Sequence, residues 1–310
     1  MRADLSSGNF IEYETFGSAQ NPCVLLIMGL ATSLLAWREE FCAMLVERGY
    51  FVVRFDNRDV GLSKHHDQHG APPLIRRALA VTMLGSLCPS VSSPYTLGDM
   101  CADAFGLLDH LRIERANLVG VSMGGMIAQT MALREPGRVA SLCSISSTTG
   151  ARDLPAGELS LRLRLLKRPR SSSHEDRSAH LLRTLALICH PAPLERDVSE
   201  YVSNAVRRNP FRPTSNARQL NAVLAQDDRT PHLGSLTLPC LVVHGRGDRL
   251  VPLAHGEATA RAIGGDARLM VIDGMGHVMT RHFYEQVVGA IVSNVERTAG
   301  TLDLGGTTDK

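Results

Sequence analysis

Ser122 lies in a Gly-x-Ser-x-Gly pattern, flanked by Gly120 and Gly124. The apolar run 116–121 before it is typical of a buried strand, and residues 123–134 after it have a helical pattern. A serine at such a sharp turn exposes its hydroxyl beside a helix N-terminus, whose free N–H groups favour developing negative charge. The two glycines fit this turn because the strand end and the helix start come almost into contact. We therefore predict that Ser122 is a nucleophile.

A serine hydroxyl needs a general base, and the base needs an acid that orients it. Asp248 and His277 each follow a short apolar run typical of a strand, residues 241–244 and 269–272. In a parallel sheet the carboxyl ends of the strands meet at one edge, so both side chains are expected beside Ser122. The chain order Ser, Asp, His also suits a triad built on such a sheet. The pattern predicts a catalytic triad of Ser122, Asp248 and His277.

Other residues near these loops are alternatives. Asp273 could serve as the acid, but its closeness in sequence to His277 argues against it. Of the 12 histidines, His244 ends a strand, His255 opens a helix, and His282 is expected in or beside the last helix. A lone loop aspartate is usually a turn or capping residue. A lone histidine is usually a surface or capping group, so each triad member has a structural alternative.

Acyl transfer through a serine also needs backbone N–H groups that stabilise an oxyanion. One is expected from Met123, the residue after the nucleophile. The other is expected from the loop after the apolar run 23–28, and we assign it to Leu30, with Gly29 allowing a tight turn. Because backbone groups do this work, the assignment depends on position rather than residue type.

A histidine-rich loop offers possible metal ligands. They are His65, His66, Asp67 and His69. These residues have neither helical nor strand spacing, which favours a solvated loop over a metal site.

Two other groups of charged residues have a structural and a functional interpretation. Asp56, Arg58 and Asp59 could bind substrate, but a hydrogen-bonded turn is favoured. The basic, leucine-rich stretches 74–87 and 159–170 could contact anionic lipid. Leucines packed inward with arginines in water are the more common arrangement.

Strand and helix patterns alternate along the first half of the chain. Apolar runs typical of buried strands cover residues 23–28, 50–55, 116–121 and 139–145, and residues 8–17 resemble a surface strand. Helical patterns cover residues 34–48, 97–111 and 123–134. The alternation predicts the α/β class, with a doubly wound, mostly parallel sheet and right-handed crossovers.

Between residues 146 and 236 the alternation stops. Helical patterns cover residues 158–167, 176–189, 194–208 and 214–226, with no convincing strand. The alternation then resumes with strands at 241–245 and 269–272 and helices at 257–263 and 283–296. We expect a core formed by residues 1–146 and 237–297, an inserted helical cap of residues 147–236, and a disordered tail of residues 298–310.

Composition narrows the class of protein. The 310 residues are 44% hydrophobic and 21% charged, as is ordinary for a globular protein, and a net charge of +2 gives no reason to expect a nucleic-acid partner. The seven cysteines are scattered and include no Cys-x-x-Cys pair, which is typical of reduced core residues. The chain start lacks the apolar region of a signal peptide, so we expect a cytoplasmic protein.

Several of these motifs occur in the order of a known family. They are Met28-Gly29-Leu30, Trp37, residues 56–63, Tyr95-Thr96, Asp99-Met100, the segment from Gly120 to Gln129, residues 245–248 and Gly274-Met275-Gly276-His277. The sequence resembles serine esterases of the α/β-hydrolase superfamily, in particular the bacterial group of LipG-type esterases/phospholipases and aclacinomycin methylesterase. The resemblance implies the α/β-hydrolase fold and cofactor-free hydrolysis of carboxylic esters. Many hydrolases of this fold have a histidine where Met28 stands, and the cap matches loosely.

We therefore expect a serine carboxylesterase that works through an acyl-enzyme and needs no metal or organic cofactor. The cap and residues 64–95 are expected to line the acyl pocket, and their leucines, with Met83 and Met126, favour a small-molecule ester that carries an apolar acyl or alkyl group. The alternatives are a thioesterase, a phospholipase or a cofactor-free perhydrolase with the same triad. A binding protein on a hydrolase scaffold is a further alternative, but it would not need all three triad residues.

Overall fold

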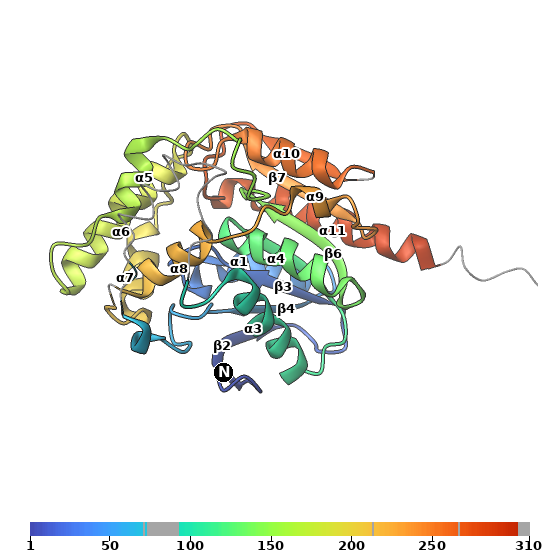
Figure 1. Ribbon diagram of the computed structural model, residues 1–310, viewed down its shortest axis with the longest axis horizontal. Helices are drawn as coiled ribbons and strands as arrows, with labels where there is room; N and C mark the ends of the chain where they lie inside the picture. The colour runs from blue at the N-terminus through green and yellow to red at the C-terminus, as the bar shows by residue number, and fades with distance from the viewer. Residues whose placement is uncertain (71, 73–92, 213, 266, 303–310) are drawn as a thin grey trace, which may run out of the picture.

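The computed structural model describes residues 1–70, 72, 93–212, 214–265 and 267–302 (Figure 1). Its described strands form one sheet in the order β1-β2-β4-β3-β5-β6-β7-β8. The strands are β1 (Arg2–Asp4), β2 (Phe10–Phe16), β3 (Cys23–Ile27), β4 (Phe51–Phe55), β5 (Ala116–Val121), β6 (Val139–Ile145), β7 (Cys240–Gly245) and β8 (Arg268–Ile272). β2 pairs antiparallel with β1 and β4, and the other neighbours are parallel. The predicted mostly parallel sheet is confirmed.

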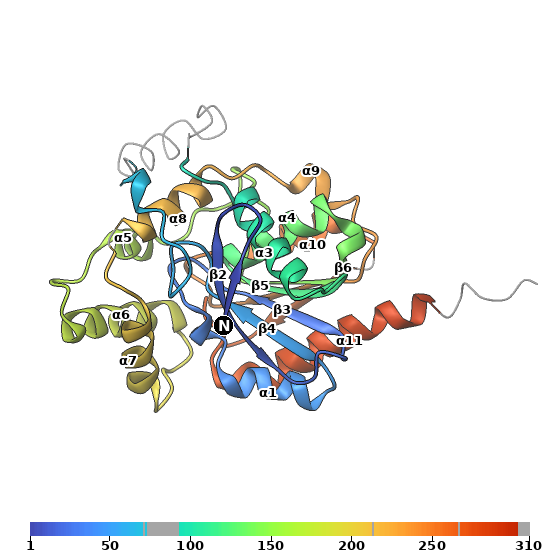
Figure 2. The same cartoon turned by 90° about the horizontal axis from the view of Figure 1, so that it is seen from below.

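Helices cover both faces of the sheet, as Figure 2 shows. One face packs against α3 (Leu97–His110), α4 (Met123–Arg134), α9 (Thr230–Leu233) and α10 (Leu253–Ile263). The other packs against α1 (Glu39–Glu47) and α11 (Tyr284–Leu302). Because both faces are covered, every residue of β3, β4 and β7 is buried, and these strands are apolar apart from Arg54 in β4 and His244 and Gly245 in β7.

Between β6 and β7, the described residues contain helices joined by loops and no strand. The longer helices are α5 (Leu159–Leu166), α6 (His174–Cys189), α7 (Val198–Arg208) and α8 (Ser215–Leu224). They lie together beside the sheet, at the left of Figure 1. The four predicted helices therefore exist, although α7 begins at Val198 rather than at the predicted residue 194, because residues 196–197 form a turn and Asp197 is the N-cap.

Other boundaries differ from the sequence-based expectations for local reasons. The predicted helix 34–48 is divided into a short 3-10 turn, Leu34–Ala36, and α1. The sequence does not predict β1 and α9, because segments of three and four residues are too short to show a hydrophobic period. α11 continues to Leu302, since no proline interrupts it, so residues 298–302 are helical where we expected a tail.

Two predictions fall on undescribed parts of the chain. The remainder of the expected tail, residues 303–310, and the basic stretch 74–87 with Met83 lie outside the described residues. Within the described part, none of the helices combines the length and the hydropathy needed to cross a membrane.

Candidate active site

Ser122 sits between β5 and α4 in a strained backbone conformation, with φ 56° and ψ −119°. A Cβ atom on Gly120 would come closer than 3.0 Å to the carbonyl oxygen of Gly124, and one on Gly124 would come equally close to that of Ile27. These backbone atoms cannot move aside, so the turn requires glycine at both positions. The two glycines of the motif thus permit the close strand–helix approach that exposes Ser122.

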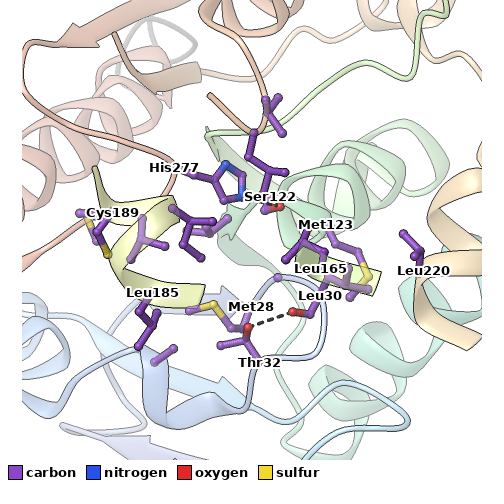
Figure 3. Close-up of a pocket in the computed structure, with 18 of the residues that line it drawn as sticks. Met28, Leu30, Thr32, Ser122, Met123, Leu165, Leu185, Cys189, Leu220 and His277 are labelled. Atoms are coloured by element: carbon purple, nitrogen blue, oxygen red, sulfur yellow. Dashed lines mark hydrogen bonds between the residues drawn. The ribbon is translucent and has the colours of Figure 1, made fainter. Parts of the chain in front are cut away.

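The loops after β7 and β8 bring the two other predicted residues to Ser122. His277 Nε2 lies 3.1 Å from Ser122 Oγ, and His277 Nδ1 lies 2.8 Å from Asp248 Oδ2. Figure 3 shows the His277 ring turned toward Ser122. The three side chains therefore form one hydrogen-bonded chain, as a nucleophile, a base and an orienting acid require.

The Asp248 carboxylate is fixed on its other side by backbone groups. Its Oδ1 accepts hydrogen bonds from the N–H groups of Leu250, at 2.9 Å, and Val251, at 2.8 Å. Burial favours the protonated acid, but the nearby His277 ring and the hydrogen bonds from His277 and Val251 outweigh it and hold the pKa of Asp248 below its usual value. Asp248 is therefore a carboxylate at neutral pH, able to stabilise a protonated His277.

The alternative residues have other partners. Asp273 is 82% exposed and pairs with Arg246. His255 is hydrogen-bonded to Thr148 and to the carbonyl oxygen of Pro155, and the His282 ring packs on Phe283. None of these described contacts joins the alternatives to Ser122.

His244 is closer to the site than its position at a strand end suggested. Its ring is fully buried, with Nε2 2.8 Å from the carbonyl oxygen of Val251 and 3.5 Å from Asp248 Oδ2. Burial lowers the pKa of His244, so the ring is neutral at pH 7. Since Nε2–H donates to Val251, His244 supports the turn that holds the Asp248 carboxylate.

Ser122, His277, Leu30 and Met123 all line one cavity of about 1370 Å³. Its walls are mainly apolar and come from both the sheet domain and the helices between β6 and β7 (Figure 3). The helical contribution includes Leu165 of α5, Leu185 and Ile188 of α6, and Leu220 of α8. Met126, predicted to contact substrate, also lines this cavity. The Ser122 side chain thus lies at the wall of an apolar space.

The polar turn of residues 56–59 is a structural network, as the favoured interpretation predicted. Asp56 accepts hydrogen bonds from the N–H groups of Leu34 and Leu62 and pairs with Arg208 of α7. Asp59 pairs with the fully buried Arg218 of α8 at 2.7 Å. The turn therefore binds two helices of the region between β6 and β7 to the sheet domain.

The histidine-rich loop belongs to the same network. His65 Nδ1 lies 3.0 Å from Ser215 Oγ, and Arg218 also pairs with Asp67. His66 and His69 stack on each other. In the part of the chain that the structure describes, no three His, Cys, Asp or Glu side chains gather as a metal site would require.

A family model for the α/β-hydrolase fold matches residues 22–280. The chain belongs to the α/β-hydrolase family. The predicted family is thereby confirmed. In this fold a triad occurs in the chain order serine, acid, histidine, which is the order of Ser122, Asp248 and His277.

Relatives and solved structures agree with this assignment. A rhodomycin D methylesterase from Streptomyces peucetius is 25% identical over 303 residues, covering 91% of this chain and 93% of that protein. A 3-oxoadipate enol-lactonase from Acinetobacter baylyi is 25% identical, covering 80% and 79%. The solved structure of an esterase from Exiguobacterium antarcticum shares the fold, with a TM-score of 0.72, 21% identity, and 96% and 99% coverage. These names agree with the predicted carboxylic ester hydrolase.

Proposed function

We propose that the protein is a serine carboxylesterase with Ser122 as nucleophile, His277 as general base and Asp248 as orienting acid. The observation that carries this proposal is the hydrogen-bonded chain Ser122–His277–Asp248 at the wall of the apolar cavity. Relatives named for methyl-ester and lactone hydrolysis support the same reaction class.

The reaction has two halves. Ser122 Oγ attacks the ester carbonyl while its proton passes to His277 Nε2, and the N–H groups of Leu30 and Met123 stabilise the resulting oxyanion. Collapse of the tetrahedral intermediate breaks the carbon–oxygen ester bond, and His277 returns the proton to the leaving alcohol. His277 then takes a proton from water, whose oxygen attacks the acyl-enzyme. The acid is released, and Ser122 regains its proton.

The substrate is an ester with a large apolar acyl or alkyl group. A cavity of about 1370 Å³ exceeds the roughly 300–1,000 Å³ of most ligand pockets. Burial of apolar substrate surface contributes about 25 cal/mol per Å², so a short acyl chain leaves most of this energy unused. We propose that residues 147–236 act as the cap that closes this cavity, because α5, α6 and α8 each contribute leucines to its wall.

The test compares initial rates on p-nitrophenyl acetate, butyrate, octanoate and palmitate. Ser122→Ala should lower kcat by at least about 10³-fold, because no other group replaces the nucleophile. Ser141→Ala is the control: Ser141 is a buried serine of β6 that bonds to Asn117 and is absent from the cavity wall. It should keep the wild-type rate, and kcat/KM should rise from acetate to octanoate.

Other outcomes would point elsewhere. Equal rates for Ser122→Ala and the wild type contradict the proposal. Ser122-dependent turnover confined to thioesters or phospholipids favours the thioesterase or phospholipase alternative, and peracid formation that exceeds ester hydrolysis favours a perhydrolase.

A further inference from the structure

The loop after β3 holds its peptide groups in fixed directions. In this oxyanion loop, residues 28–32, Ala31 has a left-handed backbone conformation with φ 57°. Such a conformation is unfavourable for alanine and persists only where its surroundings hold it. The N–H of Ala31 donates to Oε1 of Gln219 at 2.7 Å. The partner thus comes from α8, 188 residues further along the chain.

Gln219 is well suited to hold this N–H. Its side chain is fully buried, and its Nε2 donates to the carbonyl oxygen of Arg58 at 2.7 Å. A backbone carbonyl oxygen can only accept a hydrogen bond, so the NH₂ group of the Gln219 amide must face Arg58. The amide oxygen then faces the N–H of Ala31. The neighbouring Arg218 pairs with Asp59, which anchors this turn of α8 to the same segment.

The carbonyl groups of the loop are also held. Asn57 Nδ2 donates to the carbonyl oxygen of Met28 at 2.9 Å, and the Thr32 hydroxyl donates to that of Leu30 at 2.9 Å. Along the chain, the peptide N–H of Leu30 lies between the carbonyl groups of Met28 and Leu30. The loop is also close to the nucleophile, because a Cβ on Gly29 would be 3.2 Å from Ser122 Cβ. The direction of the Leu30 N–H therefore depends on the side chains that fix its neighbours.

We propose that Gln219 is a positioning residue of the reaction: through Ala31 it directs the Leu30 N–H at the oxyanion. This inference rests on the proposed function. It assigns α8 a catalytic task beyond forming the cavity wall, since the oxyanion loop adopts its active shape only when α8 is docked. Positioned donors are effective because they need no reorganisation when charge develops.

The test is Gln219→Met, which keeps the length and volume of the side chain but removes both hydrogen bonds. Loss of a whole oxyanion donor typically costs about 10²–10³-fold in kcat, so a misdirected donor should cost roughly 10–100-fold. KM for the p-nitrophenyl ester should change little. Affinity for a trifluoromethyl ketone, which forms an oxyanion on Ser122, should fall in parallel with kcat.

Gln129→Met is the matched control. Gln129 of α4 is equally buried and also makes two side-chain hydrogen bonds, to Ser144 and Arg229, but neither touches the oxyanion loop. Both variants should lower Tm, whereas only Gln219→Met should lower kcat and ketone affinity. Should Gln219→Met not fold, Gln219→Asn tests the same point, because its shorter side chain withdraws the oxygen from Ala31.

Unchanged kcat and ketone affinity in a folded Gln219 variant would overturn the inference, as would equal losses in the Gln129 control. Failure of the proposed function looks different. In that case Ser122→Ala itself would retain activity, whatever the Gln219 variants do.

Discussion

Asp248→Asn offers a sharp test of the triad because the surrounding hydrogen bonds dictate how the new amide must lie. Oδ1 of Asp248 accepts from the backbone N–H groups of Leu250 and Val251. In the variant only the amide oxygen can take that place. The amide NH₂ group must therefore occupy the position of Oδ2, 2.8 Å from Nδ1 of His277.

This orientation reverses the polarity of the hydrogen bond to His277. An NH₂ donor requires Nδ1 to be an acceptor, so the ring proton moves to Nε2, which faces Ser122 Oγ at 3.1 Å. A protonated Nε2 cannot take the serine proton, and no carboxylate then stabilises the imidazolium. An acid-to-amide change of this kind lowers kcat about 10⁴-fold, or about 5 kcal/mol of activation free energy.

The assay is the steady-state hydrolysis of p-nitrophenyl octanoate at pH 7.5, alongside near-ultraviolet circular dichroism to confirm folding. Asp273→Asn is the control, since this exposed carboxylate pairs only with Arg246 in the described contacts. It should retain the wild-type kcat. A folded Asp248→Asn variant whose kcat stays within about tenfold of wild type would refute the assigned role. If Asp273→Asn lost its kcat instead, Asp273 rather than Asp248 would be the orienting acid.

Two further predictions concern stability. Gly124→Ala should cost about 3 kcal/mol or more, because its Cβ would collide with the backbone of Ile27, whereas Gly137→Ala, which meets nothing within 4 Å, should be neutral; equal Tm values for the two variants would contradict this. The pKa of buried His244 is lowered by burial, and Asp248, His277 and His255 face it. The unfolded chain therefore binds the proton first, and stability is lost as pH falls below about 6.5, by at most about 1.4 kcal/mol per pH unit. Urea unfolding between pH 7 and 5 should show a shallower pH dependence for His244→Phe than for the wild type, and identical slopes would argue against the assignment.

Local sequence patterns were sufficient for the framework of this protein. The buried runs of β3, β5 and β7 are continuous because both sheet faces are covered, and that burial is readable in a single stretch. The framework then predicts the positions of Ser122, Asp248 and His277, because the loops that follow the carboxyl ends of parallel strands lie at one edge of the sheet. The favoured turn interpretation of residues 56–59 was also correct, since short polar side chains in a turn bond to nearby backbone.

The partners of these elements were decided only in three dimensions. Nothing in the sequence around Gln219, an ordinary position in a helix, indicates a bond to Ala31. The sequence places His244 only at a strand end, whereas in the structure its buried ring bonds to Val251 and supports the Asp248 turn. The cavity volume, too, depends on how α5, α6 and α8 dock on the sheet. Burial of a strand or helix face affects many consecutive residues and therefore produces a periodic pattern of apolar residues in the sequence. A single polar contact between distant segments produces no such pattern. The sequence by itself therefore determined which residues are candidates for the reaction. Tertiary packing decided which side chains, such as Gln219 and His244, hold the surrounding loops in position.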